Sequence, residues 1–111
     1  MITLEKQGAV TVLRPNGPID SASCDELRKS VLGGLAAGRP MVVVDCNAVP
    51  LIDNNGLETL LDLKAALESR GGAMKLAAVN SLCYDIFRVT GVDLKFEQHA
   101  FVRSAVGSFA E

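Results

Sequence analysis

The sequence is poor in the residues that build metal sites and catalytic centres. It contains a single histidine, His99, and three cysteines, Cys24, Cys46 and Cys83, that lie far apart in the chain. A zinc site usually needs close pairs of Cys or His ligands, and a catalytic histidine needs a nucleophile or ligand within reach. We therefore expect no metal, no cofactor and no enzymatic activity. We interpret the cysteines as reduced thiols, with Cys46 acting as a small buried hydrophobe.

The sequence also lacks a strong charge and a long apolar segment. Its formal net charge is -2, which provides no basic field for binding nucleic acid. No apolar run approaches the ~20 residues of a membrane-spanning helix. Residues 1–6 lack the charged start and apolar centre of a signal peptide. We therefore expect a cytoplasmic protein that binds no nucleic acid and does not insert into a membrane.

The chain nevertheless has enough apolar material for a folded domain. It has 111 residues, of which 49% are hydrophobic, and a chain of this size can bury about two-thirds of its unfolded surface. No repeat, linker or low-complexity segment divides it. We expect one domain over residues 1–111, and whether it forms a homo-oligomer is left open.

The central stretch, residues 42–57, predicts a strand, a loop and a helix. Residues 42–44 are three consecutive valines, the pattern of a parallel strand that is covered on both faces, and Pro50 prevents its continuation. Asn55 and Glu58 have the spacing of a helix capping box. The helix itself is predicted by a polar start at residues 53–55 and an apolar series at Leu57, Leu60, Leu61, Leu63 and Leu67. A polar loop is thus expected on a helix N-terminus, where free N–H groups carry partial positive charge.

The remaining elements follow from the same rules. A first helix should begin at a capping box of Ser23 and Glu26 and end near Gly38 and Pro40. A short helix capped by Ser81 should end at Gly91. The apolar stripes of these two helices are Leu27, Val31 and Leu35 in the first, and Leu82, Ile86 and Val89 in the second.

Strands are predicted at residues 2–6, 9–13, 74–79 and 94–96, with a short one at Ile19. A final amphipathic helix is predicted over residues 101–109, with Gln98 and His99 at its start. The early strands predict local hairpins. The alternation of strands and helices after residue 40 requires crossover connections and hence parallel pairing. We therefore expect a small α/β domain with a mixed sheet and about four helices.

Three carboxylates, Asp20, Asp45 and Asp53, are predicted at strand ends, where sites form in doubly wound sheets. They are candidates for a Mg²⁺ site, but we favour helix caps and turns as their roles. Hydroxyls at Ser21, Ser23 and Thr59 are close to the same predicted edge. They are alternative phosphoacceptors, although capping explains Ser23 and helix-surface polarity explains Thr59.

Three motifs together resemble a known family. Asp53, Gly56 and Leu57 match the loop of STAS domains, the fold of bacterial anti-sigma factor antagonists, which follows a hydrophobic strand and reads Asp, two small hydroxyl residues, Gly and Leu. Residues 17–20 resemble the family's Gly, apolar, Asp signature ahead of the first helix. Residues 86–92 are similar to its helix that ends in Thr-Gly. The resemblance extends over nearly the whole chain and implies the STAS fold.

The resemblance also implies a binding function. The partner would be an anti-sigma factor of the ATP-binding serine kinase type. The residue before the Gly is the family's phosphoacceptor; here it is Asn55, which has no hydroxyl, so a phosphorylation switch is not expected at this position. The partner-binding residues implied in this way are Asp20, Ser21, Asp53, Asn54, Asn55, Gly56 and Leu57. Two alternatives stay open: an accessory STAS subunit of an ABC lipid transporter, a class of subunit that resembles this chain, and a scaffold subunit of a signalling assembly.

Overall fold

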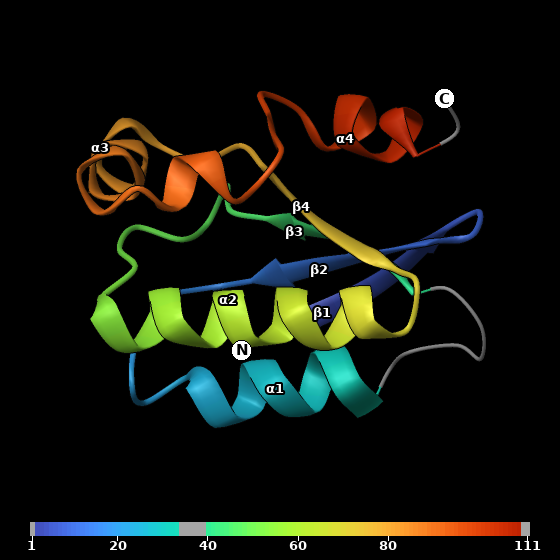
Figure 1. The fold of residues 1–111 in the computed structure, drawn as a ribbon, viewed down its shortest axis with the longest axis horizontal. Coiled ribbons are helices and arrows are strands. Elements are labelled where there is room, and N and C mark those ends of the chain that lie inside the picture. The colour runs from blue at the N-terminus through green and yellow to red at the C-terminus, as the bar shows by residue number, and fades with distance from the viewer. Residues whose placement is uncertain (1, 34–39, 110–111) are drawn as a thin grey trace.

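A five-stranded mixed sheet forms the centre of the computed structural model, which describes residues 2–33 and 40–109 (Figure 1). The strands are β1 (Ile2–Gln7), β2 (Val10–Pro15), β3 (Met41–Asp45), β4 (Ala73–Ala77) and β5 (Gln98–His99). The helices are α1 (Cys24–Gly33), α2 (Asn54–Ser69), α3 (Ser81–Thr90), the 3-10 helix η1 (Val92–Leu94) and α4 (Val102–Ser108). The predicted small α/β domain with a mixed sheet is confirmed.

The sheet combines one hairpin with parallel crossovers, and its strands are ordered as they are in the chain. β1 pairs antiparallel with β2 at the edge of the sheet, as predicted, and the turn between them uses Gly8 with φ of 63°. The pairs β2–β3, β3–β4 and β4–β5 are parallel, and a helix connects each pair. The predicted short strand at Ile19 is wrong, because Ile19 makes only a single parallel bridge, to Ile52.

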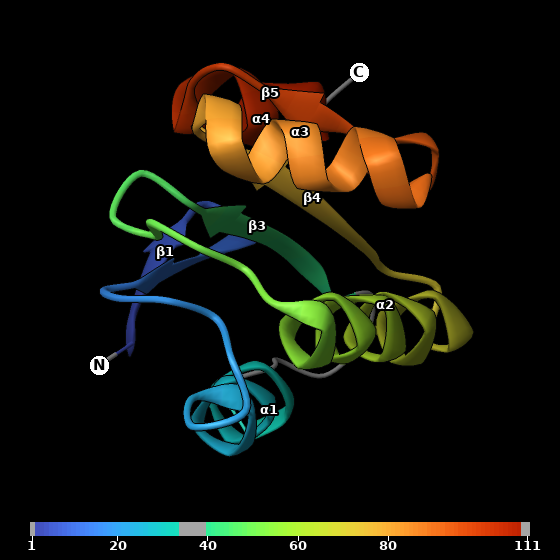
Figure 2. The same cartoon turned by 90° about the vertical axis from the view of Figure 1, so that its left-hand side faces the viewer.

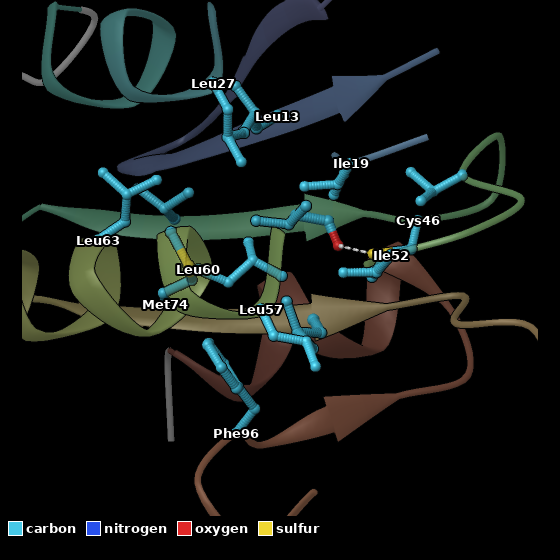
Figure 3. Close-up of a cluster of buried hydrophobic side chains, with 14 of the residues drawn as sticks. Leu13, Ile19, Leu27, Cys46, Ile52, Leu57, Leu60, Leu63, Met74 and Phe96 are labelled. Atoms are coloured by element: carbon cyan, nitrogen blue, oxygen red, sulfur yellow. Dashed lines mark hydrogen bonds between the residues drawn. The ribbon is translucent and has the colours of Figure 1, made fainter. Parts of the chain in front are cut away.

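The three central valines are buried on both faces of the sheet, as the sequence predicts. Val42 and Val44 belong to the larger core cluster, which side chains of α1, α2 and α3 complete. Val43 points to the opposite face, where Ala105 of α4 covers it. Figure 2 shows α1 and α2 side by side below the sheet and α4 above it. Figure 3 shows Leu57, Leu60 and Leu63 of α2 in the larger cluster.

The first two helices follow their predicted stripes. Leu57, Leu60, Leu63 and Leu67 of α2 are buried and Leu61 is partly buried, while Leu27 and Val31 of α1 are buried. Gly71, with φ of 77°, follows the end of α2. The predicted stripe residue Leu35 and the predicted helix end at Gly38 lie outside the described residues.

The start and the buried face of α3 differ from the prediction. Its N-cap is Asn80, whose side-chain oxygen accepts from the Cys83 N–H at 2.8 Å, and Ser81 is already the first helical residue. The residues that anchor α3 in the core are Cys83 and Phe87, both 0% exposed. The predicted apolar stripe lies on another side of the helix, where Leu82 is 55% and Val89 84% exposed. The predicted end at Gly91 is confirmed by its left-handed φ of 78°.

The C-terminal strand also differs from the prediction. Residues 94–96 form no strand: Leu94 ends η1, and β5 consists of Gln98 and His99, which were expected to start the last helix. The His99 ring pairs with Glu97 at 2.6 Å between Nε2 and Oε2, and Lys75 Nζ lies 2.9 Å from the same carboxylate. These hydrogen bonds from His99 and Lys75 lower the pKa of Glu97 to about 2. Ser108 of α4 joins this cluster, which therefore ties α4 to the sheet.

We predict that α3 depends on Phe87 and not on Leu82. Phe87→Ala removes a fully buried ring and should lower the free energy of unfolding by about 3–5 kcal/mol. Leu82→Ala, on the same helix, should change it by less than about 0.5 kcal/mol because the side chain is largely exposed. Urea denaturation monitored by circular dichroism measures both. Equal losses in the two variants would contradict the assignment of the buried face.

Candidate functional site

The segments that precede α1 and α2 are joined by backbone hydrogen bonds. The Ile19 N–H donates to the Leu51 carbonyl at 2.9 Å, and the Asp53 N–H donates to the Ile19 carbonyl at 3.1 Å. A further bond runs from the Gly17 N–H to the Ala48 carbonyl at 3.0 Å. The two predicted site segments, residues 17–20 and 53–57, therefore lie side by side although they are distant in the sequence.

Asp53 is the N-cap of α2. Its backbone is extended, with φ of −90° and ψ of −176°, and its Oδ1 accepts from the Gly56 N–H at 2.9 Å. This bond satisfies one of the free donors of the first turn. The predicted cap at Asn55 is wrong, because Asn55 already lies within the first turn of α2, where its side chain is exposed.

Asp20 has a similar role ahead of α1. Its Oδ1 accepts from the N–H groups of Ala22 and Ser23 at 3.1 and 3.2 Å. The Ser23 hydroxyl accepts from the Asp20 N–H at 3.0 Å and donates to the Pro18 carbonyl at 2.9 Å. Ser23 therefore braces the turn before α1. Both candidate carboxylates, Asp20 and Asp53, serve their own backbone, as we favoured from the sequence.

Gly56 allows the closest approach between the two segments. A Cβ atom built on Gly56 would lie 2.2 Å from the carbonyl oxygen of Ile19, a distance that real Cβ contacts do not show. Any other residue would have to push apart the segments that Ile19 and Asp53 join. Gly56 thus acts through the backbone, and it is buried together with Leu57, which is 4% exposed in the core. The expectation that Leu57 contacts a partner directly is not retained, because its side chain is inaccessible.

A shallow hollow lies between the N-terminal halves of α1 and α2. Ser21 and Asn55 are exposed on its rim, and Asn54 is exposed beside it in the first turn of α2. The Asn55 carbonyl accepts from the hydroxyl of Thr59 at 2.9 Å and from the Cys24 thiol at 3.6 Å. The residues that line the hollow are Ser21, Cys24, Asp25, Arg28, Asn55, Glu58 and Thr59.

Sequence reasoning missed the charged rim of this hollow. Asp25 and Glu58 provide negative charge at this rim. Arg28 of α1 provides positive charge, and its Nη atoms lie 4.0 Å from Asp25 of the same helix and 3.8 Å from Asp62 of α2. The i,i+3 spacing of Asp25 and Arg28 was visible in the sequence. Their position opposite Glu58 depends on how α1 packs against α2, which no local pattern encodes.

The remaining candidates do not come together in one site. Asp45 pairs with Arg14 at 3.1 Å and accepts from the Asn47 N–H at 3.0 Å. Within residues 2–33 and 40–109, no group of three or more His, Cys, Asp or Glu residues is arranged to hold a metal ion. Thr59 is 1% exposed, so its interpretation as a polar surface residue is wrong. The three cysteines are free and buried, and burial raises the pKa of Cys46 to about 12.

Comparison with known proteins identifies the family to which this fold and its loop belong. Residues 1–106 match the family model of the STAS domain. The chain belongs to the STAS domain family. No match was found among curated proteins. No helix within the described ranges is both long and apolar enough to cross a membrane.

Solved structures share the fold of this STAS domain at low sequence identity. An anti-sigma factor antagonist from Mycobacterium paratuberculosis is 22% identical with a TM-score of 0.87, over 100% of this chain and 94% of its own. Unphosphorylated SpoIIAA, an anti-sigma factor antagonist of Bacillus, is 17% identical with a TM-score of 0.83, over 99% and 96%. The murine anion transporter Slc26a9 is 18% identical with a TM-score of 0.79, over 92% of this chain but 18% of the transporter. At these low sequence identities, the structural similarity shows that the proteins share a fold and shows nothing more.

We predict that Asp53, and not Asn55, caps α2. Asp53→Ala should lower the free energy of unfolding by about 1 kcal/mol, because the Gly56 N–H loses its acceptor. Asn55→Ala should change it by less than about 0.5 kcal/mol, because the side chain is exposed. Thermal and urea unfolding of both variants measure this difference. A larger loss in Asn55→Ala would restore the capping box that the sequence suggested.

We also predict that Gly56 tolerates no side chain. Gly56→Ala should cost about 1–3 kcal/mol or more, because the new methyl group meets the Ile19 carbonyl. Gly107→Ala is the matched control, since a Cβ there has no atom within 4 Å and the position lies in α4. That variant should be neutral or stabilised by up to about 1 kcal/mol. Similar stabilities for the two variants would show that the close approach at Ile19 is unimportant.

Proposed function

We propose that this STAS domain is a non-enzymatic regulator in the cytoplasm, an anti-sigma factor antagonist that binds an anti-sigma factor of the ATP-binding serine kinase type. Its binding face comprises the rim of the hollow, with Ser21, Asn54 and Asn55 exposed. Asp20, Asp53 and Gly56 hold this face in place through the backbone. The observation that carries the proposal is the exposed Asn55 at the first turn of α2, beside α1.

The proposed mechanism depends on a neutral helix start. The first turn of α2 combines a partial positive charge with uncharged amide side chains at Asn54 and Asn55. A phosphate at this position would add about −1.5 to −2 charge and repel a partner that fits a neutral loop. Asn55 lacks the hydroxyl that a kinase would modify, so position 55 stays uncharged in the presence of ATP. The protein would therefore remain competent to bind when a relative with serine at this position is switched off.

A transporter role is the second candidate, and it rests on the resemblance of the sequence to accessory STAS subunits of ABC lipid transporters. The murine anion transporter Slc26a9 adds only that the same fold occurs within a transport protein of another kind. In that case the same face would bind the ATPase of an ABC lipid transporter. A pull-down experiment distinguishes the two proposals: the immobilised protein is used to recover its binding partners from an extract of the source cells. A serine-kinase anti-sigma factor supports the first proposal, and a transporter ATPase supports the second.

We predict that Asn55→Asp separates stability from binding. The new charge at the α2 N-terminus should leave the fold intact or stabilise it by about 0.3–1 kcal/mol. Affinity for the anti-sigma factor should nevertheless fall at least about tenfold, because the charge is added where the partner docks. Isothermal titration calorimetry with and without ATP measures the effect, and Asn55→Ser should bind until ATP permits its phosphorylation.

Asn47→Asp is the control for this experiment. Asn47 is exposed on the loop after β3, outside the residues that line the hollow, so the same change of charge should leave affinity unaltered. If Asn55→Asp binds as tightly as the wild type, the neutral-loop mechanism is wrong. If the wild type is phosphorylated at Ser21 and then released, the switch operates at a different residue.

A further inference from the structure

The start of α2 contains a pair of residues that can react with each other without an enzyme. Asn55 is followed directly by Gly56. An asparagine side chain is lost as ammonia most easily when glycine follows it, because glycine has no Cβ atom to hinder the approach of its backbone nitrogen. The only other Asn-Gly pair in the sequence is Asn16-Gly17, directly after β2. The pair at residues 55–56 is therefore the one that belongs to the α2 start of the candidate site.

The side chain of Asn55 is available for this reaction. It is exposed to solvent, and the side-chain hydrogen bonds that reach Asn55, from Cys24 and Thr59, go to its backbone carbonyl. Asn80 provides a contrast. Its side-chain oxygen accepts from a backbone N–H of α3 at 2.8 Å, and its amide nitrogen donates to the Val49 carbonyl at 3.1 Å. The amide of Asn80 is thus held at both ends, whereas no bond to a described residue holds the amide of Asn55.

The nitrogen that has to react is held by a single side chain. The Gly56 N–H belongs to the first turn of α2, where backbone donors have no partner within the helix. It donates instead to Asp53 Oδ1 at 2.9 Å. The helical backbone turns this nitrogen away from the Asn55 side chain, so the reaction requires the first turn to open. Because the ends of helices open at low cost, we expect the cap at Asp53 to limit the rate.

We propose that Asn55 is a site of spontaneous deamidation and that the cap at Asp53 limits its rate. When the first turn opens, the Gly56 nitrogen attacks the side-chain carbonyl carbon of Asn55 and gives up its proton. The new C–N bond closes a cyclic imide, and the side-chain nitrogen leaves as ammonia. Water then opens the imide to aspartate or isoaspartate. Overall, one water is consumed, one ammonia is released and an amide becomes a carboxylate, with no change of oxidation state.

The product carries a charge where the proposed binding mechanism requires none. Deamidation adds a negative charge at position 55, on the rim of the hollow. This consequence rests on the proposed function, in which the partner binds a neutral helix start. Aspartate is compatible with a helix N-terminus, whereas isoaspartate lengthens the backbone within the first turn. In both cases the protein loses its partner with age, without a kinase or ATP.

Incubation of the full chain in mildly alkaline buffer, followed by peptide mapping with mass spectrometry, tests the site. Asn55 should convert to aspartate and isoaspartate, while Asn80 stays intact. Asp53→Ala should accelerate the conversion of Asn55 about fivefold, the factor that corresponds to the loss of a helix N-cap, and leave the rate at Asn16 unchanged. Asp53→Asn retains a capping side chain and should behave like the wild type.

Circular dichroism verifies that the variants in this experiment are folded. Conversion of Asn55 no faster than that of Asn80 overturns the proposed site. Equal rates at Asn55 in the wild type and in Asp53→Ala overturn the role of the cap.

Affinity measured on aged protein tests the consequence separately. Asn55→Gln is the control, because it keeps an uncharged amide and its longer side chain forms the corresponding ring far more slowly. The affinity of the wild type for the anti-sigma factor should fall as the modified fraction rises, and aged Asn55→Gln should bind like fresh Asn55→Gln. Unchanged affinity of the modified wild type overturns the regulatory role. Failure of the fresh wild type to bind overturns the proposed function instead, and the peptide map still decides the modification site.

Discussion

The pairing of Ile19 with the segment ahead of α2 is the contact on which the candidate site depends. Two backbone hydrogen bonds hold residues 19 and 51–53 together, and the Ile19 carbonyl occupies the space where a side chain at position 56 would lie. The N-terminal ends of α1 and α2 are thereby placed side by side. The hydrogen bonds of this contact are made by backbone atoms, so the exposed side chains of Ser21 and Asn55 take no part in them.

Residues that hold the backbone and residues that are exposed to solvent are neighbours in the turns before α1 and α2. The carboxylates of Asp20 and Asp53 accept from the N–H groups of their own helix starts. Ser21 and Asn55, next to them, expose their side chains at the hollow. A change of charge at Asn55 therefore acts on the surface and leaves the cap at Asp53 intact. Because of this division, the proposed binding face could be changed by substitution without loss of the fold.

Predictions failed where two interpretations of a local pattern were equally good. Helix α3 has one apolar pair at Cys83 and Phe87 and an apolar stripe through Leu82 and Val89, and both have helical spacing. In the folded protein, Cys83 and Phe87 are the pair that packs against the core, and Leu82 and Val89 remain exposed. For the caps, Asn55 and Ser81 are acceptable cap residues by type. The chain instead begins its helices one or two residues earlier, because Asp53 and Asn80 are better placed to accept from the first turn.

The sequence by itself determined the mixed α/β fold, the central buried strand, the α2 stripe and the resemblance to the STAS family. These features follow from periodicity and from motifs within short segments, which local chemistry encodes. Only the tertiary structure decided that Thr59 is buried, that Arg28 and Glu58 border the hollow with Asn55, and that α3 exposes Val89. Each of these depends on contacts between segments that are distant in the chain, and the free energy of packing selects them only when the whole core assembles.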